Sequence, residues 1–244
     1  MKIYTVRKKI GETPLTALQR LIRQKKLPPQ SKYSYAGRLD PMAEGLLLIL
    51  ADATQAEREN MLQVRKVYEA EILFGLKTDT ADLLGMPEQR KPAPFTKMRV
   101  QDAVKKLVPS VNLPIPVFSS VQVSGKSGFV HARAGRSVVM PYRNMEVFRV
   151  ENISHTQVYQ RSVLKRIIGR VSKVQGDFRQ EMILRAWSKM LIQPNTKYTV
   201  VRFRIHCGSG TYIRSIAEYL GNRLNSPALV YGLKRTAVGK HKLP

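Results

Sequence analysis

The stretch YAGRLDPMAEGLLLIL (residues 35–50) joins a turn to a long apolar run. Asp40 stands directly before Pro41, and the apolar residues that follow are typical of a buried strand. An Asp-Pro pair in a turn needs no explanation beyond local backbone chemistry. A carboxylate used in a reaction needs a cationic partner and a pocket for its substrate. Asp40 is therefore either a turn residue or a catalytic acid, and the rest of the sequence has to distinguish these alternatives.

The charge balance is the strongest feature of the composition. The chain has 244 residues, of which 43% are hydrophobic, so it is long and apolar enough to bury a substantial core. It contains 42 Lys and Arg against 17 Asp and Glu, a net charge of +25. A protein this basic usually binds a polyanion, which makes nucleic acid the first expected partner and an anionic membrane surface the second.

Several classes of protein are disfavoured by what the sequence lacks. No apolar stretch approaches the roughly 20 residues of a membrane-spanning helix, so an integral membrane protein is not expected, and we predict nucleic acid rather than a membrane as the partner. The single Cys207 excludes an internal disulfide framework. The histidines show no paired ligand spacing, and there is no phosphate-binding glycine fingerprint, so we expect no metal and no cofactor. The N-terminus lacks a secretory signal; we expect a cytoplasmic protein, although the basic N-terminus keeps a mitochondrial location open.

Periodicity predicts helices and strands that are interspersed along the chain. Apolar spacing predicts helices over 13–27 and 96–108, whereas 66–75, 117–125 and 144–153 have strand character. Residues 198–224 read as a strand, a glycine loop and a helix. There are no regular βα repeats and no internal period. We therefore expect an α+β domain built around one mixed sheet.

The segment 159–197 differs from the rest of the chain. It is rich in Lys and Arg and contains the only tryptophan, Trp187, and its apolar spacing suggests two amphipathic helices broken near Gly176. One interpretation is a basic helical excursion that packs on the core. The other is an arm that faces RNA or docks a partner, in which case deleting 160–195 should weaken RNA binding and leave the fold intact.

Three residues are candidates for chemistry on a flat substrate. Asp40 is a potential nucleophile or general base. Arg214, on the helix that follows the glycine loop CGSGT (207–211), would keep the carboxylate ionised and oriented. Tyr68 would stack on the substrate. The glycine loop itself either binds an anion or is a tight turn. Each residue also has a structural explanation, as a turn residue, a helix-surface charge or a strand aromatic.

Five segments together resemble the TruB family of tRNA pseudouridine synthases, which modify the T-loop uridine. GRLDPMAEGLL (37–47) is similar to the family's G-x-L-D-P-x-A-x-G-x-L. The other four follow in the family's order: KVYEAEILFGLKTDTADLLG (66–85), IPVFSSVQVSGKSGFVHARAG (115–135), CGSGTYIRSIAEYLG (207–221) and LKRTAVGKH (233–241). The ordered set is far more specific than any one segment.

The resemblance implies a pseudouridine synthase fold, a mixed central sheet flanked by helices. It implies a single catalytic domain over 1–244, with a thumb-like RNA-contacting segment at about 109–145 and a basic insertion at about 159–197. The implied activity is isomerisation of uridine to pseudouridine without cofactor or metal. The implied partner is RNA, most directly the T-arm of tRNA; a ribosome or protein partner through 159–197 is also open, and the family favours a monomer.

The resemblance also assigns site residues. Asp40 falls on the essential aspartate, Arg214 on its partner and Tyr68 on the base-stacking tyrosine. The reacting base must leave its stack to reach them. Residues expected to bind the substrate are Tyr35, Arg38, Ile213, Leu233, Lys66, Gly210 and Lys126.

The sequence departs from the family pattern at several contact positions. Tyr35 stands where a His is usual, and Arg38 replaces a small residue. Val117, Phe118 and Gln122 replace Pro, Tyr and Lys. These changes leave two alternatives open: the same reaction on a ribosomal or other RNA stem-loop, or a non-catalytic RNA-binding or ribosome-associated protein.

One further departure concerns the end of the chain. The last motif is followed directly by the terminal Pro244. We therefore expect the C-terminal PUA-type extension of many relatives to be absent.

Overall fold

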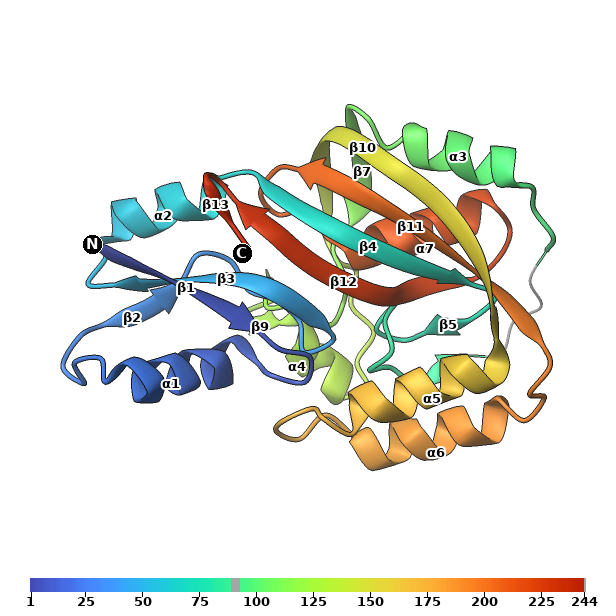
Figure 1. Ribbon diagram of the computed structural model, residues 1–244, viewed down its shortest axis with the longest axis horizontal. Helices are drawn as coiled ribbons and strands as arrows, with labels where there is room; N and C mark the ends of the chain where they lie inside the picture. The colour runs from blue at the N-terminus through green and yellow to red at the C-terminus, as the bar shows by residue number, and fades with distance from the viewer. Residues whose placement is uncertain (89–92, 244) are drawn as a thin grey trace.

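A computed structural model describes residues 1–88 and 93–243, and a nine-stranded sheet forms its centre (Figure 1). The sheet has the order β1-β3-β12-β4-β11-β10-β7, with β2 paired to β3 and β13 to β12. Its strands are β1 (Lys2–Lys8), β2 (Tyr33–Tyr35), β3 (Ala43–Ala51), β4 (Lys66–Phe74), β7 (Ser110–Pro114), β10 (Tyr142–Tyr159), β11 (Lys197–Cys207), β12 (Ala228–Val238) and β13 (His241–Lys242). Among the strands of this sheet in the described residues, only β3 and β12 pair in parallel. The expected mixed sheet is confirmed.

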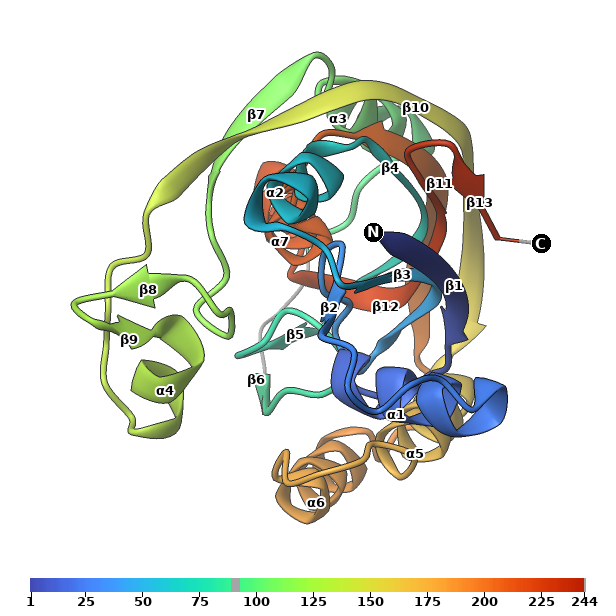
Figure 2. The same cartoon turned by 90° about the vertical axis from the view of Figure 1, so that its left-hand side faces the viewer.

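Helices cover both faces of the sheet (Figure 2). The helices are α1 (Pro14–Lys25), α2 (Gln55–Gln63), α3 (Lys97–Lys105), α4 (Gly128–Arg133), α5 (Gln160–Val171), α6 (Gln180–Met190) and α7 (Ile213–Arg223). Helices α1, α5 and α6 pack on one face, and α2, α3 and α7 lie on the other. The α+β class expected from the sequence is therefore confirmed. None of the helices in the described part of the chain has the length and hydropathy that crossing a membrane requires.

Local sequence signals account for the N-terminal elements. Thr13 caps α1, with its side chain accepting a hydrogen bond from the Thr16 N–H, and Pro14 occupies the first helical position. The apolar run 43–51 forms β3, which is covered on both faces and so contains no polar alternation.

The main core lies between the sheet and helices α3 and α7. In β4, Tyr68, Ala70 and Ile72 point into this core, as Phe203 and Ile205 of β11 do. The intervening positions in β4 are Glu residues on the opposite face, which gives the strand its period of two. The face that carries Tyr68 is thus also the face against which α7 packs.

The basic segment 159–197 forms the α5–α6 hairpin, and its apolar side belongs to the second core. The buried residues are Val163, Ile167 and Val171 of α5 and Ile183 and Trp187 of α6, packed with Leu73, Val200, Leu229 and Tyr231 of the sheet. Deleting the hairpin would expose all of these residues to water. This packing argues against the expectation that the fold tolerates deletion of 160–195.

The thumb-like segment projects from one end of the sheet (Figure 2). It leaves β7, continues through a small ribbon of β8 (Gln122–Val123) and β9 (Lys126–Ser127), passes α4 and returns in β10. The strand predicted over 117–125 is largely wrong, because this segment lies away from the sheet and pairs with β9 over two residues only. A further small ribbon joins β5 (Lys77–Thr78) and β6 (Pro87–Glu88).

Candidate active site

The structure places Asp40 against Arg214. Asp40 lies in the turn that leads into β3, and Arg214 is the second residue of α7. The Arg214 Nε–H donates to Asp40 Oδ2 at 2.8 Å. The Arg214 side chain is 7% exposed, whereas that of Asp40 is 42% exposed. The guanidinium is thus buried and fixed, and the carboxylate it orients remains open on the side that a substrate can approach.

Two backbone carbonyls complete the environment of Arg214. Its Nη1 donates to the Thr80 carbonyl at 3.2 Å, and its Nη2 donates to the Phe118 carbonyl at 3.0 Å. Burial by itself would lower the pKa of Arg214, but the charges of Asp40 and Asp82 raise it. The guanidinium therefore stays charged, and its planar fork fixes the direction of Asp40.

Asp82 is a buried carboxyl group beside this pair, and our sequence reasoning did not single it out. Its Oδ1 accepts hydrogen bonds from Thr80 Oγ1 at 2.8 Å and from the Leu84 N–H at 2.9 Å. Burial raises the pKa of Asp82 to about 6, against the opposing charge of Arg214. The only signal in the sequence was its place in the TDTAD segment (78–82).

An apolar wall adjoins the ion pair. Tyr68 and Ile213 are buried in the same cluster as Leu39, the neighbour of Asp40, and Leu233 packs against this cluster. Burial raises the pKa of Tyr68, so its hydroxyl remains protonated at neutral pH. An aromatic ring and aliphatic side chains next to one carboxylate are suited to a planar heterocycle.

Arg235, on β12, holds the turn that carries Asp40. It is 1% exposed. Its guanidinium donates to the carbonyls of Leu46 at 2.8 Å, Arg38 at 3.2 Å and Gly37 at 3.3 Å. At Gly45 the φ angle is +110°, and an added Cβ would lie 2.2 Å from the Arg235 carbonyl oxygen, so glycine permits this close approach of β3 and β12. The sequence signal for this residue was its place in the LKRTAVGKH segment (233–241), which did not indicate its role.

The N-terminal segment supports the same turn from the other side. The buried Lys8 donates from Nζ to the Ala43 carbonyl at 2.6 Å, and the Gly11 N–H donates to the Pro41 carbonyl at 2.9 Å. Burial lowers the pKa of Lys8 to about 8. Both residues therefore fix the backbone that follows Asp40.

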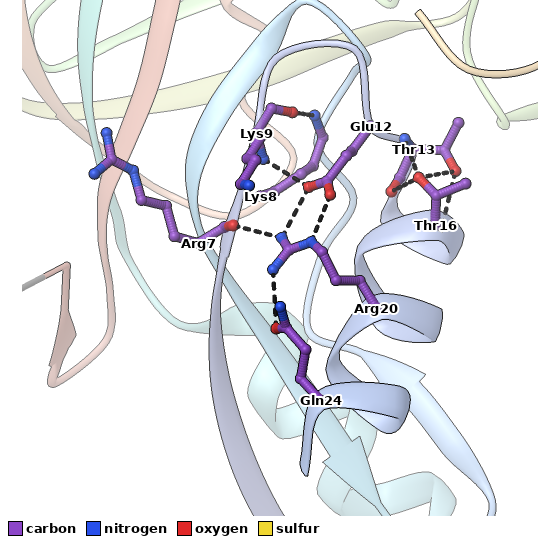
Figure 3. Close-up of polar contacts among 8 residues, drawn as sticks. All are labelled: Arg7, Lys8, Lys9, Glu12, Thr13, Thr16, Arg20 and Gln24. Carbon is purple, nitrogen blue, oxygen red and sulfur yellow. Dashed lines mark hydrogen bonds and ion pairs between the residues drawn. The ribbon is translucent and has the colours of Figure 1, made fainter. Parts of the chain in front are cut away.

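Figure 3 shows how this N-terminal loop is tied to α1. The Glu12 carboxylate accepts hydrogen bonds from the Lys9 N–H at 2.8 Å and from Arg20 Nε at 2.6 Å and Nη2 at 2.9 Å. Arg20 also donates to the Arg7 carbonyl at 2.9 Å. Although burial favours the protonated form of Glu12, its hydrogen bonds with Arg20 and the backbone lower its pKa. The ionised pair holds the loop in one conformation.

Two of the predicted binding residues lie near the site in structural roles. Lys66 donates from Nζ to the Leu62 carbonyl at 2.5 Å, and burial lowers its pKa to about 8. Gly210 has a φ of +74° in the turn before α7. Lys66 thus ties the start of β4 to the end of α2, and Gly210 shapes the turn before α7.

The remaining predicted binding residues are not gathered at Asp40. Tyr35 packs against the α1 cluster. Arg38 is adjacent to the site and exposed, and Lys126 is exposed in the β8–β9 ribbon of the thumb-like segment. In the described residues, no three or more His, Cys, Asp and Glu side chains gather in a way that would hold a metal ion.

Comparison with known proteins identifies the family. Residues 24–170, more than half of the chain, match the family described as TruB family pseudouridylate synthase (N terminal domain). The chain belongs to the TruB family. It is 26% identical to tRNA pseudouridine synthase B of Caldicellulosiruptor saccharolyticus over 86% of this chain and 59% of that protein. It is 29% identical to tRNA pseudouridine synthase B of Treponema denticola over 94% of this chain and 58% of that protein. The chain thus spans somewhat less than two thirds of the length of these curated relatives.

Solved structures share the fold of this TruB-family chain. A chain from a Cbf5-Nop10-Gar1 complex matches with a TM-score of 0.58 and 16% identity, covering 98% of this chain and 49% of that chain. A chain from an H/ACA RNP bound to a substrate RNA containing 2'-deoxyuridine matches with a TM-score of 0.55 and 15% identity, covering 98% of this chain and 48% of that chain. At these identities the likeness shows the pseudouridine synthase fold alone.

Proposed function

We propose that this protein isomerises uridine to pseudouridine in a folded RNA stem-loop, with the T-loop uridine of tRNA as the expected target. The observation that carries the proposal is the partly open Asp40 carboxylate, held at 2.8 Å by the buried Arg214 beside an apolar wall. The curated relatives that match most of the chain are named tRNA pseudouridine synthase B, which supports tRNA as the substrate.

The chemistry requires one reactive carboxylate and a pocket for the base. The flipped uridine places its ribose next to Asp40, which either attacks the sugar carbon or removes a proton from the sugar. The N-glycosidic bond breaks, the uracil turns while the apolar wall holds it, and C5 bonds to the ribose as Asp40 leaves the sugar or returns its proton. The proton on C5 is then lost and N1 gains one, so that the atoms balance. Tyr68, Ile213 and Leu233 confine the base during this rotation. No net oxidation or reduction occurs, because the product is an isomer of the substrate.

The charge of the chain supports a polyanionic substrate. A net charge of +25 supplies affinity for RNA phosphates that does not depend on sequence, and the shape of the loop supplies selectivity. The thumb-like segment projects from one end of the sheet (Figure 2), and its Phe118 carbonyl accepts from Arg214, so it is the natural element to contact the RNA hairpin.

Pseudouridine mapping on a T-arm stem-loop, full-length tRNA and a ribosomal RNA fragment tests the proposal, with wild-type protein beside an Asp40→Asn variant. The Asn side chain can still accept from Arg214 but neither attacks nor removes a proton, so product formation should fall by at least about a hundredfold. RNA affinity should be retained. Pseudouridine on the ribosomal fragment alone would mean that ribosomal RNA, and not tRNA, is the substrate. Tight binding of every RNA without product from the wild-type protein would refute the enzymatic function in favour of a binding role.

A further inference from the structure

The turn that joins α5 to α6, residues 173–179, touches the N-terminal support of the catalytic turn. The Gln175 N–H donates to the Gly11 carbonyl at 3.0 Å, and Gly11 in turn donates to Pro41. Gly11 has a φ of +87°, and an added Cβ would lie 2.2 Å from the Lys173 carbonyl oxygen. The two backbones are therefore in direct contact, and one residue separates the hairpin from the turn that holds the carboxylate.

Arg179 in the same turn joins the two segments that hold Arg214. Its Nη2 donates to Asp79 Oδ2 at 3.1 Å, and its guanidinium carbon lies 5.3 Å from the centre of the Phe118 ring. Asp79 adjoins Thr80, and the carbonyls of Thr80 and Phe118 are the two that bind Arg214. The Arg179 side chain thus contacts both of the segments whose backbone carbonyls accept hydrogen bonds from Arg214.

The thumb-like segment also docks on this turn. Arg133, the last residue of α4, donates from Nη2 to the Asp177 carbonyl at 2.6 Å. Its guanidinium carbon lies 5.9 Å from the centre of the Phe178 ring. The position of α4 therefore depends on the hairpin as well as on the strands from which the segment projects.

The turn is built to be rigid. Gln180 donates from Nε2 to the carbonyls of Val174 at 3.1 Å and Gly176 at 2.6 Å, and it accepts from the Phe178 N–H at 2.8 Å. Arg179 has a φ of +61°, a left-handed conformation that costs energy in a non-glycine residue and persists only where its surroundings enforce it. The turn therefore presents the Arg179 guanidinium in one direction.

We propose that residues 173–179 act as a clamp that positions Arg214 and the thumb-like segment, with Arg179 as its positioning residue. This inference deepens the proposed function, and the part of its test that measures RNA modification rests on that function. Without Arg179 the catalytic groups are all present, but the segments that carry the two carbonyls are less well fixed. The chemical step should therefore slow while RNA affinity changes only as much as the loss of one surface cation requires.

Arg179→Ala and Arg185→Ala make a matched pair for the test. Arg185 lies on α6 with its side chain 79% exposed and bonded to Glu181, so its removal takes the same charge from the same hairpin without touching the clamp. We expect Arg179→Ala to lower the single-turnover rate at saturating enzyme between about threefold and about thirtyfold, the range for a partly exposed ion pair with a cation–π contact. Arg185→Ala should leave this rate unchanged. The dissociation constants of the two variants for the stem-loop should agree.

A mutant cycle separates the clamp from a direct RNA contact. Asp79→Asn keeps the Oδ1 that accepts from the Met86 N–H at 2.7 Å and weakens the ion pair with Arg179. If the pair acts through the clamp, the double variant should be no slower than Arg179→Ala alone. If the rate reductions of the two single variants instead multiply in the double variant, the proposal is overturned. So would an Arg179→Ala variant that binds RNA more weakly but reacts normally at saturation, because that result assigns Arg179 to an RNA phosphate.

A second readout needs no RNA. Amide hydrogen exchange over residues 128–136 should be faster in Arg133→Ala than in Arg185→Ala, because α4 loses its contact with the turn. Exchange over residues 117–119 should be faster in Arg179→Ala than in Arg185→Ala, because the segment around Phe118 loses its contact with the Arg179 guanidinium. Equal exchange in all three would overturn the clamp. A wild-type protein that makes no pseudouridine would refute the proposed function. The comparison of hydrogen exchange would still show whether residues 173–179 position the neighbouring segments.

Discussion

Replacement of Asp82 by Asn isolates the cost of keeping a carboxyl group in the interior next to Arg214. Oδ1 of Asp82 accepts both of its hydrogen bonds, from Thr80 and Leu84, and an Asn Oδ1 can accept the same two. Burial raises the pKa of this group from 3.8 to about 6, and Arg214 opposes part of that rise. The substitution therefore removes the titration and retains the geometry.

The sign of the effect follows from where the proton is held. Below pH 3.8 the group is protonated in both folded and unfolded chains, so the free energy of unfolding does not change with pH on its account. Between pH 4 and 6 the unfolded chain loses the proton first, and the free energy of unfolding falls. At about 1.4 kcal/mol per pKa unit, the loss is about 3 kcal/mol by pH 7. Relative to wild type, Asp82→Asn should gain that amount between pH 4 and pH 7.

Urea unfolding at several pH values measures this difference through the fluorescence of Trp187, the only tryptophan, which is fully buried. Glu71→Gln is a control of opposite sign. Burial alone would raise the pKa of Glu71, but Arg202 and Arg166 lower it. The stability that Glu71 contributes is therefore present at pH 7 and is lost as the pH falls through its folded pKa. A difference between wild type and Asp82→Asn that stays constant from pH 4 to 7 would refute the reasoning.

Two further substitutions test packing and backbone support. Trp187→Ala should lower the free energy of unfolding by about 3–5 kcal/mol because it empties the centre of the α5–α6 core. Met182→Ala, 58% exposed on the same helix, should stay within about 0.5 kcal/mol; similar circular-dichroism unfolding curves for both would contradict this. Arg235→Met leaves three carbonyls without their donor and should cost about 2–4 kcal/mol, with a slower single-turnover reaction. Wild-type stability together with the wild-type rate would show that the Asp40 turn does not need Arg235.

Elements with local signals were predicted well. The Thr13 cap and Pro14 marked the start of α1, and the alternation around Tyr68 marked β4. The apolar run after Asp40 marked β3 as a strand buried on both faces. β7 was missed, because its five residues, Ser110–Pro114, become a strand only by pairing with the start of β10.

The α5–α6 hairpin shows where composition is ambiguous. Lys and Arg are abundant in 159–197, and the same segment supplies Val163, Ile167 and Trp187 to a core. Amphipathic periodicity predicts that one face is covered, and it does not say by what. The contacts with Leu73 and Val200 answer that question, and the contacts of Arg179 add a link to the catalytic arginine that no spacing in the sequence contains.

The sequence by itself determined the elements with strong local signals, such as α1, β3 and β4, together with the family pattern and the residue types of the site, because helix caps, strand alternation and motif spacing are local properties of the chain. The resemblance implied that Arg214 is the partner of Asp40, and the tertiary structure brings the two together across 174 positions. Only the tertiary structure decided that Asp82 and Arg235 stand behind them. The physical reason is that pKa shifts, buried hydrogen bonds and orientation depend on what surrounds a side chain in space. Those surroundings come from strands and helices that the fold brings together from distant parts of the sequence.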